Sequence, residues 1–545
     1  MSTNTLKEIG RGSFWGFVSA VALKILAVFY LIFQARFFDP SEIGLFQLVF
    51  SIASLATLLT DAGISDAITR YVSYYLGKGK PDSAKGMYKY SLFLFAILSF
   101  GTAAIFFLLS PLISDYYNNE KLLPLLYIAA IYVLLTFFSK GFAFIVALKN
   151  IKLNAKLSIL QQFLKVFLTV VFAFLLGAGA ETLMLALLLG FGISWIVGFV
   201  YSLKFYQEIP DAPKYSWSLF KAEVLPFSVV VAITAVMGTL IGTIDKIMLG
   251  ILLMGQFSAE QITSLIGHYT ISFSFAALLL FFTTVVGTIF LPVLSGLHGK
   301  GKQQEIRATS HLVIYWLILL SIPIFMIFLA FPSQILTILS PNYAGDSVIF
   351  MIASAGYFVF LFGWVQSMQF VAMRKNKINM LVVGSAALLN IALNLLLIPQ
   401  YNILGAVVSS SLAYSFMAGG FIYFGYKELN FELPRKLLKP LIAGALVVGV
   451  LFVFKPFLGD ILRIGIPQII NNGSTLSLLL EKIVKFGFLT MVAGFSFVIY
   501  LLGLILLKGF SKDDVNLLSG ALKKGKVPDK IINLAEKVLL WRVQR

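Results

Sequence analysis

The sequence predicts an all-α, polytopic membrane protein with fourteen membrane-spanning helices, and three observations carry that prediction. The 545-residue chain is 59% hydrophobic and 12% charged, and its mean hydropathy of +0.93 lies far outside the range of soluble proteins. Apolar runs of about 20 residues, the length that crosses a bilayer, follow one another from Phe14 to Leu507. The connections between these runs alternate between basic and nearly free of Lys and Arg.

The predicted spans follow the apolar runs in chain order. Ala20-Val21-Ala22 resembles a signal-peptide cleavage site, but the apolar run continues past it to Phe33, so the first span is predicted to stay uncleaved. The fourteen spans are 12–35, 43–65, 88–110, 122–148, 154–177, 182–203, 224–252, 263–292, 311–331, 346–370, 379–398, 403–425, 438–457 and 484–507.

Lys and Arg sort the connections into two sets. When basic residues within two positions of a span end are counted with the adjoining connection, the N-terminus, the connections after even-numbered spans and the tail from Lys508 hold 32 of the 42. The other connections then hold 6 and the span interiors hold 4. The positive-inside rule therefore predicts a multi-pass protein of the cell membrane with both termini in the cytoplasm. The net charge of +18 then reflects membrane topology, and no nucleic-acid partner is expected.

Several kinds of chemistry are excluded or not indicated. The chain has no cysteine, which excludes disulfides, thiol nucleophiles and thiolate metal ligands. Its three histidines lack metal-ligand spacing, and no Gly-x-x-x-x-Gly-Lys-Ser/Thr phosphate loop occurs, so we expect no metal and no cofactor. In the basic tail, 529–541 is predicted either to form a helix on the inner leaflet or to be solvated. Asn472 begins a glycosylation sequon in an outward loop.

Two short strings recur and predict an internal repeat. The Gly-Lys-Gly-Lys pieces of 76–84 and 298–306 are 222 residues apart, and the similar strings 147–154 and 372–379 are 225 apart. Each copy lies six spans from its partner, which predicts two six-helix lobes related by a pseudo-two-fold axis along the membrane normal, with a cavity between them. The predicted parts are the first lobe (1–203), a cytoplasmic linker (204–222), the second lobe (223–426), two extra helices (427–508) and the tail (509–545).

Several strings resemble one known family. They include ARFFDPSEIGLFQL (35–48), DAGISDAITRYVS (61–73), LSPNYAGDS (339–347) and, most specific, NIALNLLLIPQYNILGAVVSSSLAY (390–414). Together they resemble the polysaccharide-transporter branch of the multidrug/oligosaccharidyl-lipid/polysaccharide (MOP) superfamily, the Wzx-like flippases. The resemblance implies a two-lobed helical transporter that moves a lipid-linked oligosaccharide to the outer leaflet by alternating access.

The cations inside the first-lobe spans are candidate substrate ligands. A charge near the bilayer centre costs about 2.5–3.5 kcal/mol on insertion scales, so Lys24 is predicted to face a hydrated cavity. Lys165 shares a helix face with Gln161, which also suits a cavity. Lys140 is predicted either to line the cavity or to mark a contact between helices. A cationic cavity would attract the phosphate or pyrophosphate that joins sugar to polyprenol.

Other polar residues are expected to support this cavity. Arg36 and Arg70 flank the second span and are candidates for the substrate-binding cavity, with surface positioning as the alternative. Asp66 is a candidate local partner for Arg70. Asp61 is expected to pair with a cation of the first span. Five polar residues are expected to tie helices together or to act in gating: Asp61, Asp245, Lys246, Asn390 and Asn394. Asp245 and Lys246 are each expected to find a partner on another helix.

Two other functions stay open. A cation-coupled multidrug exporter of the same superfamily would need an acidic residue in the cavity, whereas the first span carries Lys24. A membrane glycosyltransferase or ligase using lipid-linked sugar would need acidic residues gathered on outward loops, and those present are scattered. We expect a monomeric, non-enzymatic flippase whose partners are the lipid-linked oligosaccharide, membrane lipids and glycan-assembly enzymes.

Overall fold

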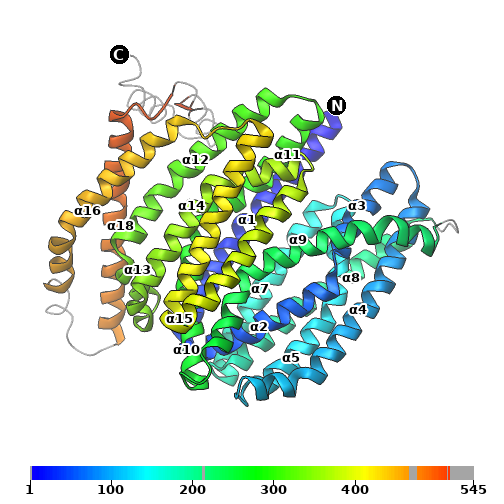
Figure 1. The fold of residues 1–545 in the computed structure, drawn as a ribbon, viewed down its shortest axis with the longest axis horizontal. Coiled ribbons are helices and arrows are strands. Elements are labelled where there is room, and N and C mark those ends of the chain that lie inside the picture. Colours follow the sequence, from blue (N-terminus) through cyan, green and yellow to red (C-terminus); the bar gives the residue numbers. More distant parts are fainter. Residues whose placement is uncertain (1–2, 211–214, 465–474, 512–513, 516–518, 520–545) are drawn as a thin grey trace.

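The computed structural model describes residues 3–210, 215–464, 475–511, 514–515 and 519, and within them the chain is almost entirely helical (Figure 1). The helices of the first lobe are α1 (Thr3–Phe37), α2 (Pro40–Asp61), α3 (Ile64–Gly77), α4 (Pro81–Tyr116), α5 (Leu122–Leu135), α6 (Lys140–Ala147), α7 (Ile151–Leu176) and α8 (Ala180–Glu208). Those of the second lobe are α9 (Trp217–Leu252), α10 (Ala259–Ala276), α11 (Phe281–Gly299), α12 (Gln303–Ala330), α13 (Pro332–Leu339), α14 (Ser347–Ala372) and α15 (Asn376–Leu429). Two further helices follow, α16 (Leu438–Ile464) and α18 (Thr475–Leu506).

Twelve helical segments of the described chain are long and apolar enough to cross a membrane. One of them is α15, which contains both the eleventh and the twelfth predicted span. The shorter apolar helix Thr490–Leu506 coincides with the fourteenth. The all-α fold class and the order of the spans are therefore confirmed.

The connection between the eleventh and twelfth spans differs from the prediction. The sequence suggested a loop after Pro399, but α15 continues through this point and only Asn402 departs from helical geometry, with φ 52° and ψ −130°. Asparagine tolerates positive φ better than most residues, so a single residue here bends the chain without a loop.

The repeat is visible in the backbone. Gly79 and Gly301, which are 222 residues apart, both adopt positive φ, at 68° and 70°. Lys149 and Arg374, which are 225 apart, do the same at 60° and 59°. Each of these left-handed residues ends one helix just before the next begins, so both copies turn the chain in the same way.

The helix starts have local causes in the sequence. Proline occupies the first turn of α2 and α4, where its missing N–H costs no hydrogen bond. Ser216 accepts from the Leu219 N–H at 3.2 Å at the start of α9. Ser258 and Gln261 form a reciprocal capping box at the start of α10.

Three of the predicted spans are broken. Between α2 and α3, Ala62 and Gly63 are both left-handed, with φ 42° and 75°. Short 3₁₀ turns separate α5 from α6 at Thr136–Ser139 and α10 from α11 at Ala277–Leu280. Helix breaks free backbone groups, and neighbouring protein must satisfy them in a membrane.

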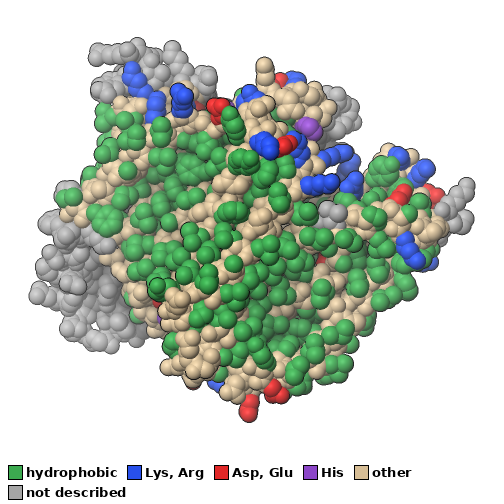
Figure 2. Space-filling model, viewed as in Figure 1, with side chains coloured by type: hydrophobic (Ala, Val, Ile, Leu, Met, Phe, Trp, Pro, Cys, Tyr) green, Lys and Arg blue, Asp and Glu red, His purple; other side chains and the backbone are tan. Residues whose placement is uncertain are grey.

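The lobes are joined along one end of the molecule, and at the other end the start of α9 packs against the first lobe. We call the end that carries residues 78–80, 149–150, 300–302 and 373–375 the basic end; Lys and Arg gather there in Figure 2, while acidic side chains show at the opposite end. One continuous apolar core contains residues of both lobes, including Val49 and Ile266. Two separate smaller cores lie toward the basic end, one around Tyr88 and one around Phe421.

Main-chain contacts close the lobes at the end opposite the basic one. A Cβ on Gly44 of α2 would lie 1.7 Å from the Thr263 carbonyl oxygen of α10. A Cβ on Gly267 would lie 1.9 Å from the Pro40 carbonyl oxygen. Only glycine permits this approach, so α2 and α10 form a tight seal. We refer to these four residues as the glycine seal.

The two extra helices stand at one edge of the second lobe, where α16 packs against α12 and α18 (Figure 1). Asn472 and the predicted surface helix 529–541 lie outside the described residues. The predicted domain boundaries stay predictions, although α8 and α9 extend into the predicted linker from both sides.

Candidate functional site

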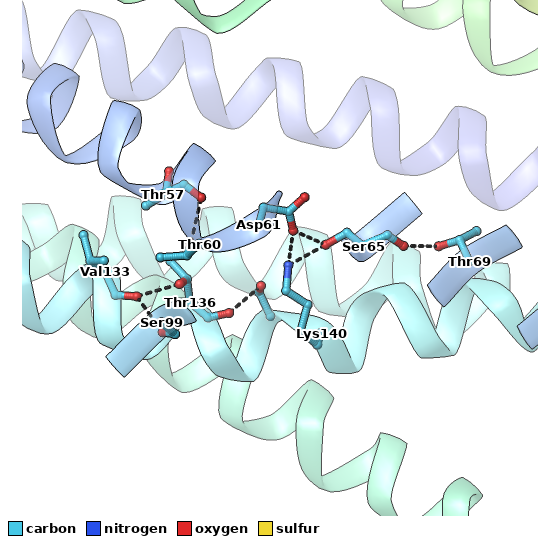
Figure 3. A network of polar contacts seen from close by, with 10 residues as sticks. Thr57, Thr60, Asp61, Ser65, Thr69, Ser99, Val133, Thr136 and Lys140 are labelled. Atoms are coloured by element: carbon cyan, nitrogen blue, oxygen red, sulfur yellow. Dashed lines mark hydrogen bonds and ion pairs between the residues drawn. The ribbon is translucent and has the colours of Figure 1, made fainter. Parts of the chain in front are cut away.

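An ion pair between a buried lysine and a partly exposed aspartate connects the two broken helical segments of the first lobe (Figure 3). The Lys140 ammonium, at the start of α6, donates to the Asp61 carboxylate at the end of α2. It also donates to Ser65 Oγ at 2.5 Å, and Ser65 donates to the same Asp61 oxygen at 2.6 Å. The Lys140 side chain is 3% exposed, and its ammonium lies 3.9 Å from the centre of the Phe95 ring. The charge of Lys140 is thus compensated inside the lobe.

This ion pair corrects the expected partner of Asp61 and bears on the two predicted roles of Lys140. Asp61 was expected to pair with a cation of the first span, and its partner is instead Lys140, 79 residues along the chain. The predicted partner was wrong because the breaks after α2 and before α6 lie beside each other in the fold. The spacing of residues within one helix cannot show that. For Lys140, the geometry favours the alternative in which it marks a contact between helices.

Lys165 and Lys24 have no acidic partner among the described residues. The Lys165 ammonium lies 4.0 Å from the centre of the Tyr30 ring of α1, a cation–π contact. Gln161 lies one turn before Lys165 on the same face of α7. Lys24 is half-buried on α1, six residues and therefore about 9 Å of helix rise from Tyr30. The two ammonium groups thus belong to adjacent helices, α1 and α7.

Arg36 has a structural contact at the end opposite the basic one. Its Nη2 donates to the Ile338 carbonyl at 2.7 Å and its Nε to the Leu339 carbonyl at 3.2 Å. These are unpaired carbonyls of the last turn of α13, so Arg36 caps that helix. The structure therefore does not bring Arg36 together with Arg70.

Arg70 lies at the basic end, beside a cavity between the lobes. Its guanidinium lies 4.4 Å from the centre of the Phe227 ring of α9. The predicted local pair with Asp66 is absent from the ion pairs of the described residues, although both line the same cavity of about 720 Å³. An adjoining cavity of about 490 Å³ is lined by Arg70, Arg374 and Asn376.

Asp245 is the centre of a buried polar cluster in the second lobe. It is 2% exposed and accepts hydrogen bonds from the Tyr269 and Ser410 hydroxyls and, at 2.6 Å, from Asn394 Nδ2. Asn390 donates to Ser410 at 3.1 Å and accepts from Asn394 at 3.3 Å. Asp245, Asn390 and Asn394 therefore tie α9, α10 and both halves of α15 together.

Lys246 does not join this cluster. Its ammonium donates to the Gly242 carbonyl of its own helix at 3.3 Å, so the expected partner on another helix is not found among the described residues. The Asp245 carboxylate and the neighbouring Asn394 Oδ1, which has no hydrogen-bond partner in the described chain, are oxygen donors of the kind that bind hard cations. No group of three or more His, Cys, Asp or Glu in the described chain could hold a metal ion.

Two further contacts have no local signal in the sequence. In the first, the Tyr71 hydroxyl donates to the Glu223 main-chain carbonyl at 2.8 Å and the Tyr75 hydroxyl to the Glu223 carboxylate, so the start of α9 is tied to α3. In the second, His268 Nδ1 lies 2.9 Å from Asp346 Oδ2. The partners are 78 or more residues apart in sequence, and periodicity within one helix cannot reveal them.

One surface pair at the basic end adjoins Arg374. Lys375 donates to Glu428 at 2.8 Å, and this hydrogen bond and the lysine charge lower the pKa of that carboxyl. Lys375 is thus compensated, whereas no ion pair involves Arg374 in the described chain.

Comparison with known proteins identifies the family. The model of the family described as "Polysaccharide biosynthesis protein" matches residues 33–345, which is more than half of the chain. The chain belongs to this family. It is also 21% identical over 460 residues to an uncharacterized membrane protein of Methanocaldococcus jannaschii, covering 81% of this chain and 89% of that protein.

Solved structures show which fold the family member adopts. The lipid II flippase MurJ in an inward closed conformation superposes with a TM-score of 0.65 at 14% identity, covering 90% of this chain and 99% of MurJ. An inward-facing multidrug resistance MATE family transporter of the MOP superfamily gives 0.58 at 13% identity, covering 79% and 95%. A MOP superfamily transporter from Pyrococcus furiosus gives 0.55 at 15% identity, covering 78% and 96%. The chain therefore has the MOP fold, and MurJ covers more of it than either transporter.

Proposed function

We propose that this protein is a flippase that moves a lipid-linked oligosaccharide, joined through phosphate or pyrophosphate to a polyprenol, from the cytoplasmic to the outer leaflet. The observation that carries the proposal is the pair of intramembrane lysines, Lys24 and Lys165, which have no acidic partner among the described residues. A cation within the membrane-spanning part of a helix is costly without a counter-charge, and a phosphate supplies that counter-charge. Membership of the polysaccharide biosynthesis family supports a glycan as the rest of the cargo.

The basic end is the cytoplasmic side in this proposal. The positive-inside rule and the cavities at that end support it, because a substrate made in the cytoplasm must enter there. The glycine seal then closes the outer side. In this cysteine-free chain, an impermeant thiol reagent on intact cells should label Ser258→Cys and Asn402→Cys. Labelling of Lys78→Cys or Lys302→Cys in their place would reverse the orientation.

Alanine variants test the role of the two lysines. Lys24→Ala and Lys165→Ala should insert and express, because removing a charge eases insertion, but should lose delivery of glycan to the outer surface. Arginine at either position should partly restore delivery, and Lys300→Ala, in an exposed loop, is the matched control. Normal delivery by the alanine variants would exclude the phosphate role. Mass spectrometry of lipids that co-purify with the protein identifies the cargo.

The Asp245 cluster favours a second candidate, a cation-coupled exporter of small molecules. This buried carboxylate accepts from hydroxyl and amide groups, and in the part of the chain that the structure describes no basic side chain donates to it. Transport driven by a sodium or proton gradient in vesicles that contain no lipid-linked glycan would establish this candidate, and Asp245→Asn should then abolish it.

A further inference from the structure

The two lobes place one arginine each beside the same cavity at the basic end. Arg70 comes from α3 of the first lobe, and Arg374 from the left-handed turn that precedes α15 in the second. Both line the cavity of about 490 Å³, together with Asn376. Arg70 and Asn376 also line the adjoining cavity of about 720 Å³, so the two spaces meet at the same side chains.

Both guanidinium groups lack an acidic partner. No ion pair or hydrogen bond of Arg70 or Arg374 to another side chain is found in the described chain, whereas the adjacent Lys375 is paired with Glu428 at 2.8 Å. Arg70 is held by its stacking on the Phe227 ring, which leaves the N–H edge of the guanidinium unused. Two arginines from different lobes thus present unused donors to one space.

The larger cavity is also lined by Thr69, Thr234 and the carboxyl group of Asp66. Its two asparagines suit the sugar part of a phosphosugar. Asn376 begins α15, and the first N–H groups of a helix have no partner within the helix and favour an anion. One turn further on, Asn379 lines the larger cavity, and its Oδ1 is buried without a hydrogen-bond partner. A buried acceptor of this kind is satisfied by a hydroxyl donor, and a sugar carries several.

We propose that Arg70 and Arg374 form an anion site that binds the phosphate or pyrophosphate of the entering substrate and bridges the two lobes, with Asn376 and Asn379 facing the attached sugar. The inference deepens the proposed function and rests on it for the identity of the ligand. Arginine forms two parallel hydrogen bonds to phosphate, so one phosphate group can engage both lobes at once.

The site links occupancy to closure of the basic end. Two guanidinium groups repel each other, and the repulsion grows as the lobes approach. A bound phosphate replaces the repulsion with two attractions. The empty protein therefore resists closure at the basic end, and the loaded protein closes.

The experiment measures closure directly with spin labels. Lys78→Cys and Lys300→Cys place one label on each lobe at the basic end of the cysteine-free chain, and pulsed electron resonance reports the distance in nanodiscs of neutral phosphatidylcholine. Inorganic pyrophosphate, as the probe, should shorten the distance. Arg70→Gln and Arg374→Gln should each raise the half-saturating pyrophosphate concentration at least tenfold, because each removes charge-assisted hydrogen bonds. The lysine variants should fall between.

A matched control separates the site from general surface charge. Arg307→Gln removes an exposed arginine at the same end that lines neither cavity. It should leave the half-saturating pyrophosphate concentration unchanged. If the three variants Arg70→Gln, Arg374→Gln and Arg307→Gln have the same half-saturating pyrophosphate concentration, the proposed anion site is wrong. If nanodiscs containing phosphatidylglycerol shorten the distance without pyrophosphate, and only when both arginines are present, the site stands and a phospholipid headgroup is its occupant.

Glycan delivery in cells, measured in parallel, distinguishes the two proposals. A protein that delivers glycan but whose pyrophosphate response does not depend on the arginines retains the proposed function and loses the site. A protein whose pyrophosphate response depends on the arginines but which delivers no glycan retains the anion site and loses the proposed function.

Discussion

Each lobe contains an aspartate whose carboxylate connects several helices, and the two carboxylates have different partners. Asp61 in the first lobe is paired with the buried ammonium of Lys140. Asp245 in the second lobe accepts only from neutral hydroxyl and amide groups, although Lys246 is its neighbour in sequence. The backbone turns are repeated at Lys149 and Arg374 almost to the degree. Duplication has therefore kept the path of the chain while the buried charges diverged.

The divergence suggests separate tasks for the lobes. In the first, positive charge exceeds negative charge inside the membrane, because Lys140 is compensated and Lys24 and Lys165 are not. In the second, the buried cluster holds a carboxylate that no described cation contacts. An anionic cargo suits the first lobe, and a small cation or a proton suits the second.

The largest expected effect comes from separating the two members of the first-lobe pair. Asp61→Asn keeps the shape but leaves the Lys140 ammonium, 3% exposed, without its counter-charge, which should lower the free energy of unfolding by about 3 kcal/mol. Thermal unfolding of the purified protein measures this. The double variant Asp61→Asn with Lys140→Met should recover most of the loss. A single variant as stable as the wild type would remove the contrast between the lobes.

The next effect concerns the contact that joins the lobes. Gly44→Ala puts a Cβ within 1.7 Å of the Thr263 carbonyl oxygen, so α2 and α10 must move apart, at a cost of about 2 kcal/mol. Ser258→Cys should then react faster with a thiol reagent. Gly101→Ala is the matched control, because no heavy atom lies within 4 Å of its added Cβ. Equal effects of the two substitutions would show that the seal does not limit the approach of the lobes.

A smaller loss of stability is expected in the second lobe. Asp245→Asn removes the charge but keeps one oxygen acceptor for Tyr269, Ser410 and Asn394, and it leaves no buried cation without a partner. We expect the free energy of unfolding, measured by thermal unfolding, to fall by about 1 kcal/mol. Lys246→Met, which removes only a contact with its own helix, should cost less. A loss that matches Asp61→Asn would mean that Asp245 has a charged partner.

The smallest effect lies outside both lobes, at Asp514 after α18. Burial alone would raise the pKa of Asp514, but hydrogen bonds from Lys436 and Ser511 outweigh it and hold the pKa below its ordinary value of about 4. This pair therefore adds stability above that pH, and the contribution is lost as the pH falls through the lowered pKa. Lys436→Met should lower the melting temperature slightly at pH 7. The difference from the wild type should narrow toward pH 3, and a constant difference would contradict the assignment.

The sequence was sufficient for features set by composition and by short strings. Hydropathy and the distribution of Lys and Arg predicted the spans, and the two recurring strings predicted the repeat that Gly79, Gly301, Lys149 and Arg374 display in their φ angles. The contacts between helices were harder to predict from the sequence. Asp61 and Lys140 are 79 residues apart, and Arg36 caps a helix more than 300 residues away. A pattern within one helix gives the face on which a residue lies but not the helix that covers it.

The anion cavity illustrates the same limit. Arg70 was a candidate because it flanks a span, but Arg374 looked like one of several loop cations. Only the packing of α3 beside α9 and the start of α15 brings the two arginines to one space.

The glycine seal has a mechanical consequence for the transport cycle. Its contacts are made by main-chain atoms at van der Waals distance, with no ion pair or side-chain hydrogen bond among the four residues that define it. Dispersion attraction falls steeply with distance, and a gap of 0.5–1 Å already forfeits a quarter to a half of it. The contact between α2 and α10 is therefore either fully formed or broken, with almost no stable intermediate separation. The end that carries the glycine seal, which is the outer side in the proposed orientation, should therefore open in one step once the closing basic end transmits enough force along α2 and α10.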